Sequence, residues 1–385
     1  MTERRVRAPE AGDEATDPWD TWVSAQARAI ADAGRWRTLR GVEGGGTRVR
    51  LEGRFEPVIS FASNDYLGLA HHPLVRAAAA GAADRFGAGV GSSRLVAGER
   101  SVHRDLEAAL AEWSGSEAAL VFPTGYQANL AVLATFGHGA RIVSDALNHA
   151  SIVDGARLAR GEVAIYRHGD ADHAADLIAS APDRAVVVTD TVFSMDGDVA
   201  PIAALSAHCA RHHALLVLDD AHAVLPVETP DPQAHVLRVG SLSKAFGSQG
   251  GYVTGPRPWI DLVVNKARTF VYTTGLSPAD AAAAAAAIAV CRSEDGERLR
   301  QRLRSNVDRL RPAHSTPIIP IVIGGERQAL HVAEVLLDQG LFVPTIRPPT
   351  VPAGSSRLRI SLSAAHCEAD VTHLARALAG LGRAE

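Results

Sequence analysis

The sequence predicts an α/β fold with a large, mostly parallel sheet domain followed by a smaller α+β domain. Between residues 100 and 255, short apolar runs alternate with helical stretches. Apolar runs that are separated by helices are typical of parallel strands buried on both faces of a sheet. After residue 277, a helix-rich stretch gives way to a mixture of apolar runs and helices, which indicates the second domain.

Each element follows from a local pattern. Residues 19–40 carry apolar side chains three and four positions apart, which predicts a helix. Residues 41–57 contain Gly44-Gly45-Gly46 among short alternating runs, which predicts a turn and a hairpin. The expected strands of the large sheet are residues 118–122, 141–144, 163–167, 185–190, 214–219, 236–241 and 251–255.

The C-terminal part has its own pattern. There we expect strands at 317–323 and 357–362, and helices at 326–339 and 367–382. The chain therefore divides into an N-terminal arm and helix (1–58), a large domain (59–288) and a small domain (289–385).

Composition excludes several classes of protein. The 385 residues include 39 Lys and Arg against 43 Asp and Glu, with no basic stripe of the kind that binds nucleic acids. The three cysteines are far apart, which fits a reducing cytoplasm. The first residues contain no signal-peptide pattern, and the apolar tract 279–290 is too short to span a bilayer. We expect a cytoplasmic protein without membrane or nucleic-acid partners.

Lysine is rare in this chain, because Lys244 and Lys266 are its only two. A lysine amine can lose its proton and attack a carbonyl, whereas a guanidinium stays protonated. Lys266 lies in an amphipathic helical pattern, so we interpret it as a surface residue. Lys244 lies in the stretch 239–247, which is rich in small and hydroxyl residues and follows an apolar run. It is the candidate for an imine-forming lysine.

The residues around Lys244 favour pyridoxal 5'-phosphate (PLP) over a cofactor-free aldolase. This cofactor needs an acid at its ring nitrogen, an aromatic group on its face and a cradle for its phosphate. Asp219 ends an apolar run and is the candidate acid, although it is also in a position to cap a helix. His222 follows three residues later, and His149 is the candidate for stacking, although an isolated histidine is more often structural.

The phosphate cradle is expected where Phe122-Pro123-Thr124-Gly125-Tyr126 begins a helical pattern, because amides at a helix start bind anions. Ser241 and Ser243 add hydroxyl donors. Two other patterns are rejected. The glycine-rich loop 87–94 lacks the GxGxxG order of a dinucleotide site. The adjacent pairs at 71–72 and 212–213 lack the helical spacing of metal ligands, so no metal site is expected.

Five blocks in order along the chain resemble the α-oxoamine synthases, a family of PLP enzymes with the aspartate aminotransferase fold (fold type I). The resemblance extends from about residue 20 to 380. The blocks are Phe61–Leu69, Gly91–Gly98, Val192–Asp198, Asp219–His222 and Ser241–Lys244. A further stretch, residues 346–366, is similar to members that join L-alanine to a pimeloyl thioester.

The resemblance implies a role for each site residue. Lys244 carries the cofactor and moves the Cα proton, while Asp219 pairs with the pyridine nitrogen and His149 stacks on the ring. The other implied cofactor residues are Gly125, Tyr126, Ser194, His222 and Ser241, with Thr273 and Thr274 lent by a neighbouring subunit. Asn64 and Arg359 hold the amino-acid carboxylate, and Thr350 and Arg37 lie near the acyl substrate.

The resemblance also implies the partners, which are L-alanine, pimeloyl-CoA or a pimeloyl carrier protein, and a second copy of the chain in a homodimer. The closest alternative is a family member that uses glycine and a short acyl-CoA. A ligand sensor that keeps the fold but not catalysis usually carries a DNA-binding domain, and residues 1–58 are too short and too acidic for one.

One departure from the family pattern lies after His222. Family members usually continue with glycines, whereas this chain reads Ala223-Val224-Leu225-Pro226-Val227, and the segment 223–235 is shortened. We therefore expect the loop to take another shape, with consequences for the acyl pocket or for the subunit contact.

Overall fold

The computed structural model describes residues 17–381, which form two compact units. The smaller unit comprises residues 17–44 and 49–57 and contains helix α1 (Pro18–Asp32). Strands β1 (Val42–Gly45) and β2 (Arg48–Leu51) form the predicted hairpin. The helix expected over 19–40 ends early, because Gly34 adopts a left-handed φ of 66° and its amide donates back to the Ala31 carbonyl.

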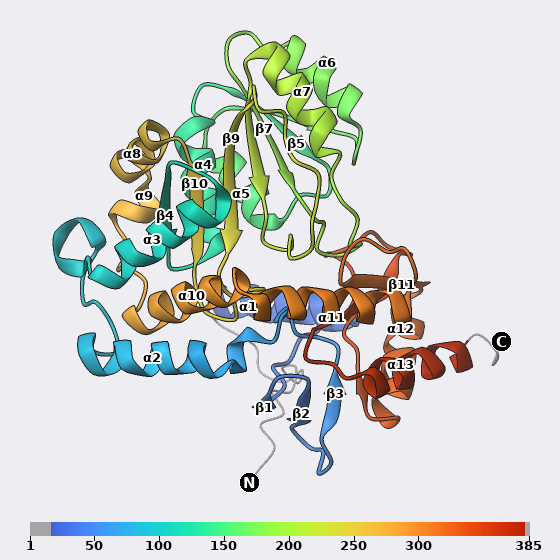
Figure 1. Ribbon diagram of the computed structural model, residues 1–385. Helices are drawn as coiled ribbons and strands as arrows, with labels where there is room; N and C mark the ends of the chain where they lie inside the picture. Colours follow the sequence, from blue (N-terminus) through green and yellow to red (C-terminus); the bar gives the residue numbers. More distant parts are fainter. Residues whose placement is uncertain (1–16, 382–385) are drawn as a thin grey trace. The chain divides into compact units, whose positions relative to one another are not determined.

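The larger unit, residues 45–48 and 58–381, is built on a seven-stranded sheet (Figure 1). Its strand order is β4-β10-β9-β8-β7-β5-β6, and the pairs from β9 to β6 are parallel, while β10 is antiparallel to both neighbours. All seven predicted strands are present. They are β4 (Ala118–Phe122), β5 (Arg141–Asp145), β6 (Glu162–Tyr166), β7 (Ala185–Asp190), β8 (Leu215–Asp219), β9 (His235–Ser241) and β10 (Gly251–Gly255).

Helices cover both faces of this sheet. On one face, the buried core includes residues of α4 (Gly125–Phe136), α5 (Ala150–Leu158), α8 (Arg257–Lys266) and α9 (Arg268–Val271). On the other face, α6 (Ala171–Ala179) and α7 (Ile202–His212) pack over the β5–β8 half. The β4–β10 half is covered there by α2 (Pro73–Phe86), α3 (Ser101–Ser114) and α10 (Pro278–Cys291), which pack together. Short helical turns, η1 (Leu69–His71) and η2 (Arg94–Gly98), precede α2 and α3 respectively.

The C-terminal part forms a second, three-stranded sheet. After α11 (Glu294–Leu310), the antiparallel order is β11-β14-β13. Strand β3 (Val58–Ser60) pairs in parallel with β12. The remaining elements are β11 (Ile318–Gly324), α12 (Glu326–Asp338), β12 (Leu341–Phe342), β13 (Thr345–Ile346), β14 (Ser356–Ser361) and α13 (Glu368–Leu381). The predicted strands and helices of this region are confirmed, while its status as a separate domain from residue 289 stays a prediction.

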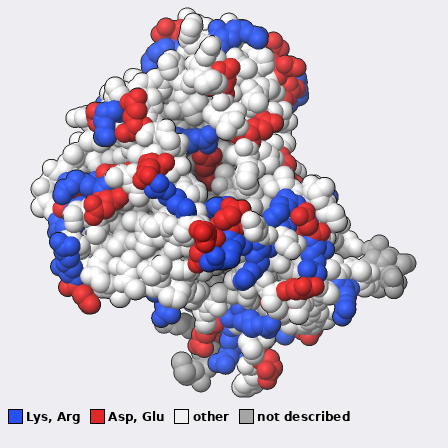
Figure 2. Space-filling view, viewed as in Figure 1, with Lys and Arg blue, Asp and Glu red and all other residues white. Residues whose placement is uncertain are grey.

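Charges of both signs are interspersed on the face shown in Figure 2, without an extended field of one sign. Many belong to local pairs, such as Arg300 with Glu297. Lys266 is exposed at the end of α8, as expected. Within residues 17–381, no helix combines the length and the apolar character needed to cross a membrane.

Candidate active site

The predicted site residues meet at the carboxyl edge of the large sheet. Strands β7, β8 and β9 are parallel and end at Asp190, Asp219 and Ser241, so these residues share one edge. A cavity of about 240 Å³ opens there. Its wall consists of Thr124, Gly125, Tyr126, Asn129, His149, Ser151, Asp190, Asp219, Ala221, His222, Gly240, Ser241, Ser243, Lys244 and Gln249.

Lys244 projects into this cavity from the turn that follows β9. The Gly247 amide donates to the Lys244 carbonyl, and Gly247 adopts a left-handed φ of 60°. A Cβ at Gly247 would lie 2.2 Å from the Ala70 amide nitrogen, so the turn requires glycine. Burial lowers the pKa of Lys244, although Asp219 and Asp190 oppose this effect. The amine therefore becomes neutral more readily than an exposed lysine does.

Asp219 is held at the base of the cavity by two donors. The Asn129 side-chain amide donates to Oδ2 at 2.6 Å, and the Ala221 backbone amide donates to Oδ1 at 2.9 Å. Asp190 lies beside it, and burial together with the charge of Asp219 raises the pKa of Asp190 well above its ordinary value. The Asp219 carboxylate, which accepts two hydrogen bonds, is suited to hold a pyridinium proton.

His149 caps the start of α5 and lines the same cavity. Its Nδ1 lies 2.7 Å from the Ser151 hydroxyl, which accepts a hydrogen bond from Asn129 at 2.9 Å. Burial lowers the pKa of His149, with Asp219 opposing and Lys244 reinforcing the shift. A neutral imidazole at this position is suited to stack on a planar ring.

A cradle for an anion lies at the start of α4. Thr124 Oγ1 accepts from the Gln127 amide at 3.1 Å, while the amides of Gly125 and Tyr126 belong to the helix start and have no intrahelical acceptor. The strand ends approach this turn closely, since a Cβ on Gly251 would lie 2.4 Å from the Gly125 Cα. The Ser241 and Ser243 hydroxyls, 2.8 Å apart, complete the cradle.

These features fit PLP. The cavity offers a buried amine for the aldehyde, a paired carboxylate for the ring nitrogen, a neutral imidazole for the ring face and a helix start with hydroxyls for the phosphate. One polar atom of this wall, Asn129 Oδ1, is buried without a partner in the described chain.

A buried guanidinium lies beside the lysine. Arg359, on β14, is 5% exposed, and its Nη1 donates to Asn64 Oδ1 at 3.1 Å and to Ser361 Oγ at 2.7 Å. Its Nε donates to the Ser194 carbonyl. Within residues 17–381, Arg359 pairs with no carboxylate, whereas its neighbour Arg357 pairs with Asp196. A buried, unpaired guanidinium is suited to bind a substrate carboxylate.

A hydrogen-bond chain links this arginine to the lysine. Lys244 Nζ lies 2.9 Å from His222 Nε2, and His222 Nδ1 lies 2.6 Å from the Tyr66 hydroxyl. Tyr66 in turn contacts Asn64 Oδ1 at 3.1 Å, the atom that also accepts from Arg359. Burial raises the pKa of Tyr66 to about 12, and burial together with the charge of Lys244 lowers the pKa of His222 well below its ordinary value.

Tyr66, Asn129 and Ser151 are site residues that sequence reasoning missed. Tyr66 lies within the quoted block 61–69, and Asn129 follows the Thr124–Tyr126 turn, but nothing in either local pattern distinguishes them from core residues. Asn129 contacts Asp219, which lies 90 positions away in the sequence. Tyr66 contacts His222, which lies 156 positions away. Their roles therefore arise from contacts between distant segments.

Besides Asn64 and Arg359, five predicted residues stand apart from the cavity wall. Ser194 contributes its carbonyl to Arg359, and its contact with the cofactor stays a prediction. Thr273 accepts from the Gln127 side chain at 3.4 Å, and Thr274 is exposed. Thr350 is also exposed, and Arg37 lies in the smaller unit. Their roles toward a second subunit or the acyl substrate stay predictions.

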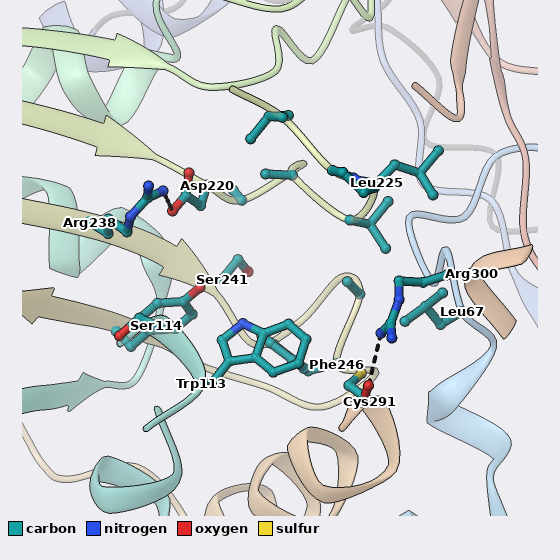
Figure 3. Close-up of a pocket in the computed structure, with 17 residues that line it drawn as sticks. Leu67, Trp113, Ser114, Asp220, Leu225, Arg238, Ser241, Phe246, Cys291 and Arg300 are labelled. Carbon is teal, nitrogen blue, oxygen red and sulfur yellow. Dashed lines mark hydrogen bonds and ion pairs between the residues drawn. The ribbon is translucent and has the colours of Figure 1, made fainter. Parts of the chain in front are cut away.

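The unusual segment after His222 lines a second cavity of about 380 Å³ (Figure 3). Residues 223–227 contribute one wall, and Trp113 and Phe246 contribute another. Its charged groups are already paired, since Arg238 donates to Asp220 and Arg300 donates to the Cys291 carbonyl. The two cavities share Ala221 and Ser241, so the segment 223–227 lines a cavity adjacent to the first one.

Comparison with known proteins supports the same family. The aminotransferase class I and II family matches residues 56–378. An 8-amino-7-oxononanoate synthase from Anaeromyxobacter dehalogenans is 45% identical over 380 residues, covering 94% of this chain and 95% of the relative. An enzyme of the same name from Burkholderia thailandensis is 48% identical over 347 residues, covering 83% of this chain and 88% of the relative.

A solved structure is also similar over nearly the whole chain. A serine palmitoyltransferase variant from S. paucimobilis, with a bound PLP–myriocin aldimine, superposes with a TM-score of 0.87. It is 28% identical and covers 96% of this chain and 99% of its own. With a cavity that fits PLP, these findings show that the chain belongs to the aminotransferase class I and II family, has the type I fold of PLP enzymes, and is a PLP-dependent acyltransferase of the α-oxoamine synthase group.

Proposed function

We propose that this enzyme condenses L-alanine with a pimeloyl thioester and releases 8-amino-7-oxononanoate, carbon dioxide and the free thiol carrier, as a step of biotin biosynthesis. The observation that carries the proposal is the hydrogen-bond chain from Lys244 to Arg359, because it connects a buried amine suited to accept a proton with a buried guanidinium suited to bind a carboxylate. The near full-length relatives named 8-amino-7-oxononanoate synthase support the choice of substrates.

Binding of the amino acid depends on Arg359 and Asn64. The guanidinium pairs with the carboxylate, and the Asn64 amide group holds the guanidinium at 3.1 Å. When bound, PLP supplies an electron sink for the charge left at Cα after its proton departs. Lys244, as a neutral amine, accepts that proton, and His222 holds its Nζ at 2.9 Å.

The net reaction balances with one proton taken up from the solvent. A bond forms between the alanine Cα and the thioester carbonyl carbon, and the thiol leaves with a proton. The original carboxyl group then leaves as carbon dioxide, and a proton takes its place at Cα. Asp219, whose carboxylate accepts two hydrogen bonds, would hold the proton on the ring nitrogen of bound PLP.

The test uses purified, PLP-loaded protein with L-alanine and pimeloyl-CoA, and measures release of free CoA thiol together with the condensed product. Glycine with acetyl-CoA tests the alternative member of the family. L-serine with palmitoyl-CoA tests the activity suggested by the structural neighbour. A pimeloyl carrier protein replaces the CoA ester in a parallel reaction.

Alanine-dependent thiol release with either pimeloyl donor supports the proposal. Turnover with glycine or serine that exceeds turnover with alanine overturns it. The cytoplasmic location and the homodimer are further parts of the proposal.

A further inference from the structure

The loop Val192–Val199 determines where the Ser194 carbonyl meets Arg359. The loop follows β7, and its ends are joined by a β-bridge between Val192 and Val199. Within it, the Phe193 amide donates to the Asp198 carbonyl at 2.9 Å and the Gly197 amide donates to the Phe193 carbonyl at 2.8 Å. The loop is therefore a tight unit, and a displacement at one end moves the Ser194 carbonyl.

One side of the loop is fixed to the C-terminal sheet. Asp196 pairs with Arg357 of β14, and the Gly197 carbonyl accepts from Thr316 Oγ1 at 2.6 Å. Gly197 has a φ of 70°, and a Cβ there would lie 2.0 Å from the Ile318 carbonyl oxygen. This close contact brings the loop against the sheet that carries Arg359.

On its other side, the loop contacts the imidazole of His168. His168 Nε2 lies 2.8 Å from Asp198 Oδ2, and its Nδ1 lies 2.9 Å from Asp145 Oδ1 at the end of β5. The ring also packs edge-on against Phe193, with centroids 4.4 Å apart. A carboxylate only accepts hydrogen bonds, so both contacts are satisfied together only when the imidazole carries two protons.

The surroundings of His168 favour that charged form. Burial of the ring opposes it, but Asp145 foremost, and then Asp198, outweigh the burial and raise the pKa of His168 above its ordinary value. Asp145 lies near Tyr166 and Asp190, and burial raises the pKa of both groups, which favours their neutral forms. On the same loop as His168, Arg167 pairs with Asp170, and the His173 Nδ1 accepts from the Arg167 amide.

We propose that His168 is a positioning residue for the amino-acid site, and that its imidazolium fixes Asp198 so that the Ser194 carbonyl orients Arg359 toward the substrate carboxylate. The inference rests on the proposed role of Arg359 in binding that carboxylate. Loss of the imidazolium proton removes one of the two hydrogen bonds of His168, which weakens the attachment of the loop on the side away from β14. Amino-acid affinity falls, while the chemistry at Lys244 is unchanged.

The experiment compares the PLP-loaded wild type with His168→Gln and with the matched control His173→Gln. L-alanine binding is titrated through the absorbance of the bound cofactor between about pH 6 and 9, a range that spans ordinary histidine titration. We expect His168→Gln to weaken alanine binding about tenfold at neutral pH, which corresponds to the loss of one charge-assisted contact. The kcat of His168→Gln at saturating alanine and its cofactor content stay within about twofold of wild type. For His173→Gln, alanine affinity, kcat and cofactor content all stay within about twofold of wild type.

The pH dependence gives a second readout. In the wild type, alanine affinity decreases as the pH rises through the titration of folded His168, whereas His168→Gln shows no such decrease. The contribution of His168 to thermal stability changes with pH in the same direction as alanine affinity. Because the folded pKa of His168 is raised, its stabilisation is present at low pH and is lost as the pH rises through that pKa, so the difference in Tm between wild type and His168→Gln narrows toward alkaline pH.

Other variants separate the possible failures. Asp198→Asn removes the partner charge while keeping the size of the side chain, and we expect it to weaken alanine binding as His168→Gln does. Unchanged alanine affinity in both variants overturns the inference, as does a loss of cofactor that accounts for the weaker binding in both. If Arg359→Gln leaves alanine affinity unchanged, the proposed role of Arg359 is wrong. If Arg359→Gln weakens binding and the other two variants do not, only the role of His168 is wrong.

Discussion

At the scale of single residues, the site depends on which atoms carry protons. The hydrogen bonds from Lys244 through His222 to Tyr66 are compatible with two arrangements of their protons. In one, Lys244 donates to His222 Nε2, and His222 Nδ1–H donates to the Tyr66 oxygen, whose own proton points to Asn64. In the other, Tyr66 donates to Nδ1, and Nε2–H donates to the neutral amine. Tyr66 therefore supports both protonation states of the lysine.

Replacing Tyr66 with phenylalanine tests this role. The change leaves His222 Nδ1 buried without its partner, at a cost of about 1–3 kcal/mol, so we expect kcat to fall about tenfold to a hundredfold. Cofactor content is expected to be retained, because Tyr66 does not line the cofactor cavity. Since burial raises the pKa of Tyr66 to about 12, the hydroxyl stays protonated through neutral pH and adds no titration of its own there.

Steady-state kinetics with L-alanine measure the effect of Tyr66→Phe. The matched control is Tyr252→Phe, because Tyr252 is also buried but borders the second cavity. An equal fall in kcat in the two variants contradicts the specific role of Tyr66.

At the scale of elements, the phosphate cradle depends on close packing between the start of α4 and the end strands of the sheet. Gly125 begins the helix, and Gly251 begins β10 directly beside it. A side chain at position 251 has no space, since its Cβ would lie 2.4 Å from backbone atoms of Gly125. The proposed anion site at the helix start therefore requires that the neighbouring strand lack a side chain there.

The variant Gly251→Ala is therefore expected to displace the first turn of α4. We expect a Kd for PLP at least about tenfold above that of the wild type, because the amides of Gly125 and Tyr126 leave their positions. Titration of the apoprotein with PLP, followed by absorbance, measures this change. The control is Gly81→Ala in the exposed part of α2, where a Cβ meets nothing within 4 Å. That variant is expected to keep the PLP affinity and to gain about 0.5–1 kcal/mol in stability. Equal PLP affinity of Gly251→Ala and Gly81→Ala contradicts the proposed dependence of the phosphate cradle on the packing of Gly251 against Gly125.

At the scale of the whole molecule, the site collects residues from distant segments. Lys244 comes from the large sheet, Arg359 comes from the C-terminal sheet, and Tyr66 comes from the segment between β3 and α2. The predicted phosphate ligands Thr273 and Thr274 are absent from the wall of their own cavity. This arrangement is consistent with their prediction as donors to a second copy of the chain.

Mixing two inactive variants tests this sharing. We expect Lys244→Arg to retain its fold but lose turnover, because a guanidinium neither forms the imine nor accepts the proton. A Thr273→Ala/Thr274→Ala variant is expected to bind PLP weakly. After co-refolding of equal amounts, half of the dimers are hybrids with one intact site, so activity is expected to recover to about a quarter of wild type.

The reference for subunit exchange is a chain that carries Lys244→Arg, Thr273→Ala and Thr274→Ala together, co-refolded with wild type. Absence of any recovery, while mixed dimers are detected by mass, excludes sharing of these threonines between subunits.

The order of the elements followed from local sequence, and the local sequence also predicted the chemistry of the lysine. The seven strands of the large sheet were predictable because each is a short apolar run between helical patterns, and Asp219 and Ser241 were predictable at their ends. The end of α1 was predicted too late, because the turn depends on the left-handed conformation of Gly34. Lys244 was identifiable because an arginine-rich chain keeps a lysine only where its amine is needed, or at an exposed position such as 266.

The sequence by itself thus determined the fold class and the cofactor, and it predicted the acid, the imidazole and the amine of the site, because strand periodicity and side-chain chemistry are local properties. The tertiary structure alone decided the pairs that link these groups, such as Tyr66 with His222, Asn129 with Asp219 and His168 with Asp198. These contacts join segments that only the packing of two sheets and their loops brings together. Their energies also depend on burial, which raises or lowers a pKa according to the surroundings of a side chain and not according to its neighbours in sequence.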